Sequence, residues 1–227
     1  SRRNRSIENP SSCLCPRDRL GSLSWVAVMS ENKIKKLAVF CGSSLGFEEI
    51  YAQEARKLGS VLHQHQIGLV YGGASVGIMN EIANTVLTLG GEAIGVMPES
   101  LVKVEIAHKN LTHLHVTKSM HERKAVISDL SDGFILLPGG VGSLEEFFEV
   151  FTWSQLGYHQ KPCGVLNIHG YFDGLLQFLN HTVASGFVKQ AHLDSIIVEQ
   201  DPEKLIQRFQ NYSPVIETKW IKKKSEL

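Results

Sequence analysis

The stretch of sequence that decides the fold is residues 133–146, which read GFILLPGGVGSLEE. Its first five residues, 133–137, are an almost unbroken apolar run, which is typical of a strand buried on both faces of a sheet. A proline and two glycines end the run, and residues 143–156 then carry a helical pattern. A strand, a glycine turn and a helix in this order indicate one unit of an α/β fold.

The same alternation continues in both directions from this unit. Apolar runs predict five further strands, at residues 37–41, 68–71, 93–97, 163–167 and 196–198, and residues 114–116 are a short strand candidate. Helical spacing predicts helices at residues 48–64, 77–89, 119–130, 172–184 and 202–209. Strands that alternate with helices are joined by right-handed crossovers, which give a mostly parallel sheet. We therefore expect a Rossmann-like, doubly wound α/β sheet with helices on both faces, in a single domain.

The two ends of the chain differ in character from the part between them. Residues 33–215 contain no repeat or low-complexity linker, so they form the expected nucleotide-binding domain. Residues 1–32 contain an arginine-rich start and no hydrophobic period. We interpret them as a disordered leader ahead of a natural start at Met29, in preference to a transit peptide. Residues 216–227 are expected to form a charged, solvated tail.

Charge and composition exclude several classes of protein. The 227 residues include 23 Lys and Arg against 23 Asp and Glu, so the chain has no general attraction to nucleic acid or to an anionic membrane. No apolar run approaches the roughly 20 residues that span a bilayer. The four cysteines show no paired spacing, and a chain of this length needs no disulfide framework. We expect a cytoplasmic protein that binds any anion at a local site.

Three glycine turns follow predicted strands and therefore share one edge of the sheet. They are Gly42-Ser43, Gly72-Gly73 and Gly139-Gly140. Ligands of such sheets bind beyond the carboxyl ends of the strands, and glycine lets backbone N–H groups approach them closely. The sequence matches neither the dinucleotide fingerprint nor the Walker motif, which argues against a nicotinamide dehydrogenase and an ATPase.

The turn before the helix at residues 143–156 has two interpretations. Free N–H groups and partial positive charge at a helix N-terminus favour phosphate, and the Ser143 hydroxyl adds a donor, so residues 138–143 form a candidate phosphate cradle. Alternatively, Ser143 caps the helix and Glu146, three residues on, completes a capping box. In that case Glu146 has no chemical role.

A second segment, Ser119 to Lys124, also begins with a capping box, formed by Ser119 and Glu122. Arg123 and Lys124 follow in the first turns of the helix, where the dipole disfavours cations. One interpretation is that both side chains extend into solvent. The other is that they face a bound anion, which would offset the unfavourable position.

Histidine and cysteine give no indication of a metal. His113 and His115 would share one face of a strand, but two ligands do not make a zinc site. Cys41 and Cys163 lie within predicted strands and are expected to be core residues. We therefore expect no metal and no cofactor.

Residues 119–124 (SMHERK) and 138–146 (PGGVGSLEE) together resemble the paired signature of the LONELY GUY (LOG) family. Similar flanking residues extend the resemblance over about residues 35–200. Members of the family are cytokinin riboside 5′-monophosphate phosphoribohydrolases, formerly labelled lysine decarboxylases. The resemblance implies a homodimer that binds AMP or N6-modified AMP and hydrolyses it to the free base and ribose 5-phosphate. The decarboxylase label does not fit, because the chain has no Ser-x-His-Lys segment to carry pyridoxal phosphate.

The resemblance also implies roles for individual residues. Catalytic roles fall on Arg123 and Glu146. Contacts with the substrate fall on Glu105, Lys124, Gly140, Val141, Gly142, Ser143, Glu145 and Thr152. The chain departs from the family at two of these positions: Ser143 replaces the usual Thr and keeps the hydroxyl, whereas Val141 replaces a frequent Tyr.

The chemistry of the bond supports these roles. Breaking an N-glycosidic bond develops positive charge on the sugar, and a nearby carboxylate such as Glu146 can stabilise that charge or activate water. The planar fork of Arg123 suits phosphate or ribose oxygens. Two alternatives remain open: a non-catalytic carrier of a nucleotide or of molybdenum cofactor on the same fold, and a hydrolase of another phosphorylated ligand.

Overall fold

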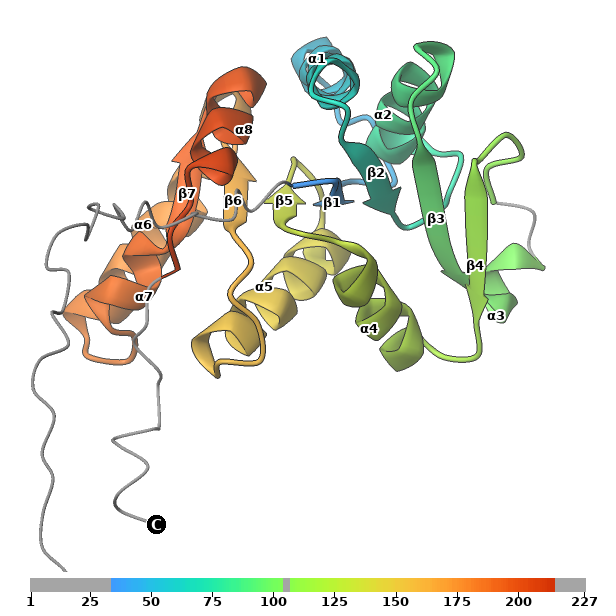
Figure 1. Cartoon of the computed structure of the whole chain (residues 1–227). Coiled ribbons are helices and arrows are strands. Elements are labelled where there is room, and N and C mark those ends of the chain that lie inside the picture. Colours follow the sequence, from blue (N-terminus) through green and yellow to red (C-terminus); the bar gives the residue numbers. More distant parts are fainter. Residues whose placement is uncertain (1–33, 104–106, 215–227) are drawn as a thin grey trace, which may run out of the picture. The chain divides into compact units, whose positions relative to one another are not determined.

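A parallel β-sheet forms the centre of the fold (Figure 1). The structure is a computed structural model that describes residues 34–103 and 107–214. Within these residues the sheet has seven strands in the order β4-β3-β2-β1-β5-β6-β7, and every pairing between them is parallel. The strands are β1 (Lys36–Phe40), β2 (Gly68–Tyr71), β3 (Ala93–Pro98), β4 (His113–Thr117), β5 (Phe134–Leu136), β6 (Cys163–Leu166) and β7 (Ile196–Glu199).

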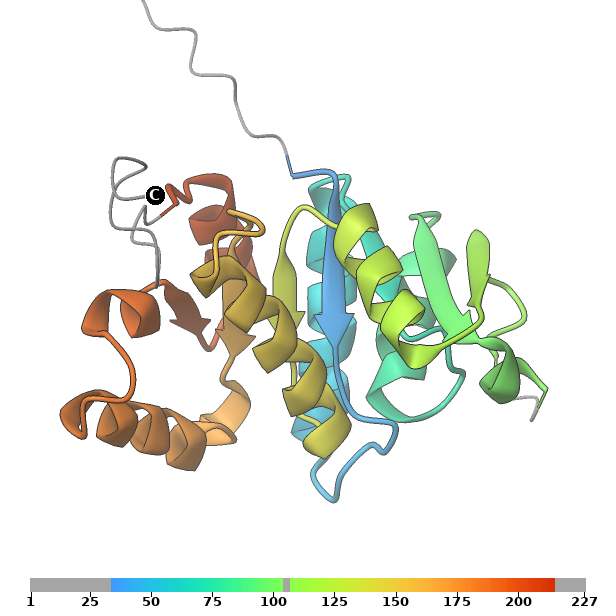
Figure 2. The same ribbon diagram turned by 90° about the horizontal axis from the view of Figure 1, so that it is seen from below.

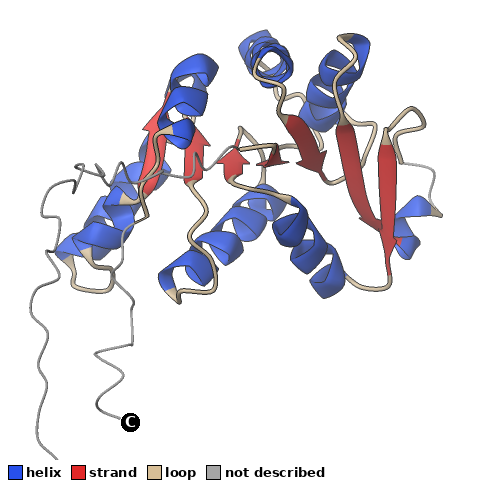
Figure 3. Cartoon of the chain, viewed as in Figure 1, coloured by secondary structure: helices blue, strands red, loops and turns tan. Residues whose placement is uncertain are grey.

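Helices cover both faces of the sheet (Figures 1, 2 and 3). They are α1 (Glu49–Gln64), α2 (Gly77–Thr88), α3 (Glu99–Val102), α4 (Met120–Leu130), α5 (Val141–Gln155), α6 (Asp173–Ala184), α7 (Gln190–Asp194) and α8 (Pro202–Gln210), with a 3-10 turn at Ile168–Gly170. Side chains of α1, α2 and α8 pack on one face, and those of α4, α5, α6 and α7 pack on the other. The prediction of a doubly wound, Rossmann-like α/β sheet is confirmed.

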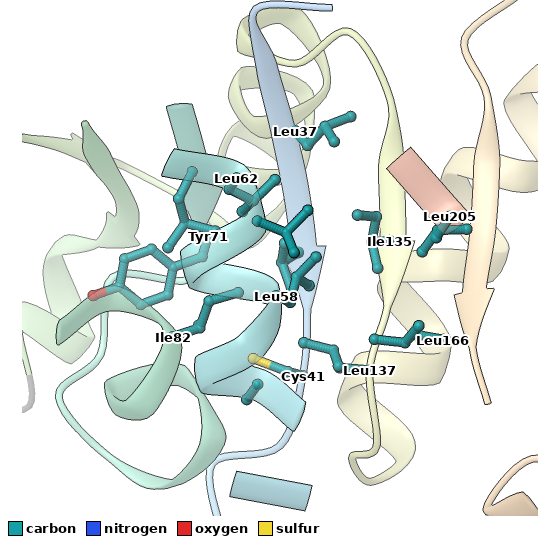
Figure 4. Close-up of a cluster of buried hydrophobic side chains, with 14 of the residues drawn as sticks. Leu37, Cys41, Leu58, Leu62, Tyr71, Ile82, Ile135, Leu137, Leu166 and Leu205 are labelled. Carbon is teal, nitrogen blue, oxygen red and sulfur yellow. The ribbon is translucent and has the colours of Figure 1, made fainter. Parts of the chain in front are cut away.

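The apolar runs of the sequence form strands whose side chains are buried on both faces of this sheet. Figure 4 shows Leu37 and Ile135 of neighbouring strands facing Leu58 of α1 and Leu205 of α8. All four are fully buried, and burial of one such side chain contributes about 1.5–3 kcal/mol to stability. The strands can be apolar on consecutive residues because helices cover both faces.

Cys41, which follows β1 directly, and Cys163 of β6 are core residues, as predicted. Cys41 and Cys163 are both free and buried. Burial raises the pKa of the Cys163 thiol to about 12 and raises that of Cys41 still further. Neither sulfur is therefore a thiolate at neutral pH, which is the form that a nucleophile requires.

The direction of winding reverses between β1 and β5. From β1 the chain proceeds outward through β2 and β3 to β4, and α4 then carries it back across the sheet to β5 beside β1. This crossing brings the carboxyl ends of β1 and β5 together, and the Gly42 amide donates to the Pro138 carbonyl over 3.0 Å. Such a switch point is where open α/β sheets bind ligands.

Two short helices were not expected from the sequence. The irregular stretch 98–112 contains α3, and α7 lies between α6 and β7. The predictions of a leader at residues 1–32 and a tail at 216–227 concern segments outside the described residues. Among residues 34–103 and 107–214, no helix combines the length and the apolar character that crossing a membrane requires.

Candidate active site

The loop between β5 and α5 presents a free helix N-terminus at the switch point. Helix α5 begins at Val141 and is preceded by Gly140, whose backbone is extended at φ −89° and ψ −161°. The first four N–H groups, those of residues 140–143, have no acceptor within a helix. Free N–H groups of this kind, together with the helix dipole, are suited to binding an anion such as phosphate.

The start of α5 changes the interpretation of Ser143 and Glu146. The alternative of a capping box is wrong, because the helix begins two residues before Ser143 and no side chain caps it. Gly140 takes the capping position, which its extended backbone permits. Ser143 is instead the third residue of the helix, and Glu146 lies in its second turn. The carboxylate of Glu146 is therefore available for another partner.

That partner is Arg123 of α4. The Arg123 Nη1 group donates to Glu146 Oε1, and Arg123 Nε donates to the Val96 carbonyl of β3 over 2.9 Å. Only 10% of the Arg123 side chain and 14% of the Glu146 side chain are exposed. The interpretation that Arg123 extends into solvent is wrong, since a carboxylate from the adjacent helix holds it inside the protein.

The helix that carries Arg123 begins as predicted. The Ser119 hydroxyl caps α4 by accepting from the Glu122 amide over 3.1 Å. Glu122 in turn accepts from the Lys118 amide over 2.7 Å, one residue before the position expected for a capping box. The cap fixes the first turn of α4, and therefore the point from which Arg123 projects.

Burial dominates the electrostatics of Glu146. Loss of hydration raises the pKa of its carboxyl group above the ordinary value, although the positive charge of Arg123 opposes the shift. A carboxylate with a raised pKa accepts a proton more readily at neutral pH than an exposed one does. The positive charge of Arg123 favours the ionised form of Glu146. The carboxylate is therefore negatively charged and also more basic than an exposed one.

Glycine at position 72 allows the guanidinium to approach the backbone. A methyl group at Gly72 would lie 2.7 Å from Arg123 Nη2. Gly73, the second glycine of this turn, is required for a different reason. Its φ of 82° lies in the left-handed region, and it packs against Gly95 of β3. The structure therefore brings Gly72, Arg123 and Glu146 together.

The Gly139 backbone is packed even more closely, which gives a stability prediction. A methyl group at Gly139 would overlap the Ser143 hydroxyl and lie 2.8 Å from the Gly42 nitrogen. We expect Gly139→Ala to lower the free energy of unfolding by about 1–3 kcal/mol, as overpacking does. Gly140→Ala is the matched control, because its methyl group would meet nothing within 4 Å. Urea unfolding checks the pair, and equal losses would contradict this account of the loop.

Lys124, the neighbour of Arg123, also pairs with α5. Its ammonium lies 2.7 Å from Glu145 Oε1 and 3.0 Å from Glu149 Oε2. Hydrogen bonding to Glu145 raises the pKa of Lys124, so this amine stays charged. The interpretation that it extends freely into solvent is wrong for Lys124 as well. Two consecutive residues of α4 thus fasten that helix to α5.

A cleft of about 270 Å³ opens at the carboxyl ends of β1 and β5. It is lined by Gly42, Ser43, Ser44, Leu45, Gly46, Tyr51, Ile78, Pro138, Gly139, Gly140 and Tyr171. The structure therefore brings together the glycine turns Gly42-Ser43 and Gly139-Gly140, as the sequence predicts. Tyr51, Ile78 and Tyr171 also line the cleft and were not predicted from the sequence.

Of the described residues that the resemblance implies, Gly140 lines this cleft, whereas Arg123 and Glu146 are not among its lining residues. Val141 is 83% exposed at the start of α5. Thr152 lies six residues after Glu146, about 9 Å along the helix and turned by about 240° from it, and its hydroxyl donates to the Phe148 carbonyl over 2.7 Å. Glu105 lies outside the described residues. Within the described part of the chain, no three His, Cys, Asp or Glu side chains are grouped to hold a metal ion.

Comparison with known proteins now defines the class to which this fold and site belong. Residues 79–209 match the family model described as "Possible lysine decarboxylase". Among solved structures, the molybdenum cofactor carrier protein of Chlamydomonas reinhardtii has a TM-score of 0.60 at 19% identity, over 78% of this chain and 99% of that one. The molybdenum cofactor binding protein of Rippkaea orientalis has a TM-score of 0.59 at 20% identity, over 78% and 96%. These structures show the shared fold.

Curated relatives give the family. The cytokinin riboside 5′-monophosphate phosphoribohydrolase of Rhodococcoides fascians is 47% identical over 170 residues, which are 74% of this chain and 86% of the relative. An Arabidopsis thaliana protein of the same name is 41% identical over 184 residues, 81% of this chain and 86% of the relative. The chain belongs to the LOG family of cytokinin riboside 5′-monophosphate phosphoribohydrolases.

Proposed function

We propose that this protein hydrolyses the N-glycosidic bond of a nucleoside 5′-monophosphate to a free base and ribose 5-phosphate. The observation that carries the proposal is the buried carboxylate of Glu146, held by Arg123 one to two helical turns from the free amides of residues 140–143. This spacing suits a ribose whose phosphate lies on the amides and whose anomeric carbon faces the carboxylate.

The reaction follows from this placement. The amides hold the phosphate and thereby position the sugar, which contributes several kcal/mol to lowering the barrier. As the bond between C1′ and the base breaks, Glu146 stabilises the positive charge on the sugar and accepts a proton from the attacking water. The water oxygen joins C1′, and the proton passes to the departing base. Arg123 keeps Glu146 ionised and offers its remaining donors to ribose hydroxyls.

The names of the relatives support N6-modified adenine nucleotides as substrates, and we include AMP in the proposal. The alternative of a non-catalytic carrier has less support. Relatives at 41–47% identity carry the name of a hydrolase, whereas the carriers are 19–20% identical and share only the fold. A buried carboxylate beside the anion site also gives a carrier no evident advantage.

Base release tests the proposal directly. The full chain is incubated with isopentenyladenosine 5′-monophosphate, AMP and adenosine, and the products are separated by chromatography. We expect free base and an equal amount of ribose 5-phosphate from the modified nucleotide and from AMP, and none from adenosine, which lacks the phosphate. A protein that binds both monophosphates and releases base from neither would be a carrier.

We also propose that the protein acts as a homodimer in the cytoplasm. If Thr152 contacts substrate, the α5 geometry favours a second copy as its donor, because Thr152 lies on another face of the helix from Glu146. Light scattering should then give about twice the chain mass of 25.2 kDa. The free, buried thiols of Cys41 and Cys163 are compatible with a reducing compartment.

A further inference from the structure

The turn after β6 is held in a defined shape beside the glycine loop. Asn167 Oδ1 accepts from the Phe172 amide over 2.8 Å, and Asn167 Nδ2 donates to Asp173 Oδ1 over 2.7 Å. Between them, His169 has φ of 51° and Gly170 has φ of 74°. A histidine in this left-handed region is uncommon, and it persists only where the surroundings fix the backbone. The turn therefore presents Tyr171 in one position.

Tyr171 reaches from this turn to the phosphate cradle. Its hydroxyl donates to the Gly139 carbonyl over 2.9 Å. Its ring lies edge-on to Tyr51 of α1, with centroids 5.4 Å apart, and edge-on to Phe172, with centroids 4.8 Å apart. The same ring lines the 270 Å³ cleft. Tyr171 therefore connects β6 to the loop between β5 and α5 across the mouth of the site.

The carbonyl that Tyr171 holds belongs to the peptide group that supplies the Gly140 amide. This peptide is trans, so its C=O and N–H point in opposite directions. Glycine on both sides leaves the peptide unusually free to rotate, and a Cβ at Gly140 would meet nothing within 4 Å. Fixing the Gly139 oxygen therefore also fixes the direction of the Gly140 N–H.

We propose that Tyr171 is a positioning residue that orients the Gly140 amide toward the phosphate of the bound nucleotide. The inference rests on the proposed function in one respect, namely that a phosphate occupies the start of α5. It assigns to Tyr171 a share of phosphate affinity and no part in the bond-breaking step.

Tyr171→Phe tests this assignment, because it keeps the ring and removes only the hydroxyl. Loss of one ordinary hydrogen bond should raise the Kd for ribose 5-phosphate and the KM for AMP by about three- to tenfold. The value of kcat should stay within twofold of the unaltered protein, since the anomeric carbon still faces Glu146. Calorimetry measures the Kd without any need for turnover.

Tyr158→Phe is the matched control. It makes the same chemical change at a tyrosine that is 78% exposed and outside the cleft, so both constants should be unchanged. Thermal unfolding of both variants should match that of the unaltered protein, which separates positioning from general damage. A Tyr171→Phe variant with a Kd within twofold of the unaltered value, or with kcat lowered as much as affinity, would overturn the inference.

The same measurements separate this inference from the proposed function. If the unaltered protein binds ribose 5-phosphate but releases no base, the hydrolase proposal fails while a raised Kd in Tyr171→Phe still supports the role of Tyr171. If the unaltered protein releases base and the variant binds ribose 5-phosphate normally, only the role of Tyr171 fails. If the unaltered protein does not bind ribose 5-phosphate, the inference is overturned, because no phosphate occupies the loop.

Discussion

Replacing Glu146 with glutamine is expected to lower kcat for base release by about a thousandfold, the usual scale of general acid–base catalysis. The amide cannot accept a proton from water and does not stabilise positive charge on the sugar as a carboxylate does. Its oxygen can still accept from Arg123, so the buried guanidinium stays hydrogen-bonded although it loses its negative partner. The fold should therefore survive, and the KM should change little.

Glu149→Gln is the matched control for this prediction. Glu149 lies three residues further along α5, its side chain is 27% exposed, and it pairs with Lys124 instead of Arg123. We expect its kcat to remain within a few-fold of the unaltered value. Chromatography of released base and a melting curve are measured for both variants. Turnover by Glu146→Gln close to that of the control would remove Glu146 from the mechanism.

Replacing Arg123 with methionine should affect both activity and stability. The change leaves the Glu146 carboxylate buried without its partner, and breaking a buried pair in this way costs about 3–5 kcal/mol at neutral pH. Base release should also fall by at least about a hundredfold, because the ribose loses a donor and Glu146 becomes harder to ionise. Urea unfolding at pH 7 and the base-release assay measure the two effects.

The pH dependence of that loss identifies its cause. Without Arg123, the pKa of Glu146 should rise further, since the opposing charge is gone and burial remains. A carboxyl group with a raised folded pKa destabilises the protein above that pKa, and the penalty disappears as pH falls below the ordinary value of about 4.3. The stability deficit of Arg123→Met should therefore shrink on acidification.

A double variant provides the control. Adding Glu146→Gln to Arg123→Met removes the stranded charge, so it should restore much of the lost free energy of unfolding at pH 7. Additive losses in the double variant would show that the two side chains are not coupled. A deficit that stays constant between neutral and acid pH would lead to the same conclusion.

Most of the fold follows from the sequence because its strands are apolar on consecutive residues. Six such runs, each followed by a helical segment or a turn, identify a buried parallel sheet before any contact is known, whereas β4 at the edge of the sheet is interrupted by histidines and mostly exposed. The helices α3 and α7 were missed, because four or five residues are too few to show a helical period. The direction of the strands alone predicts that the glycine turns share one edge.

The candidate site was less predictable, because its central contact joins distant segments. Arg123 and Glu146 are 23 residues apart and meet only through the packing of α4 against α5. Local rules also conflicted at the start of α5, where both Gly140 and Ser143 are acceptable caps. The extended Gly140 backbone decided the question in the structure. Tyr171 gave no local signal, since its hydroxyl bonds to a carbonyl 32 residues earlier in the chain.

The crossing of α4 between the two halves of the sheet has a consequence for how activity is acquired. Arg123 lies on the segment that returns from β4, whereas Glu146 follows β5, on the other side of the reversal. Neither half of the chain contains both Arg123 and Glu146. A nascent polypeptide or a fragment that ends before α5 therefore lacks Glu146. Recovery of turnover during refolding therefore reports the docking of one half on the other, and not the formation of secondary structure.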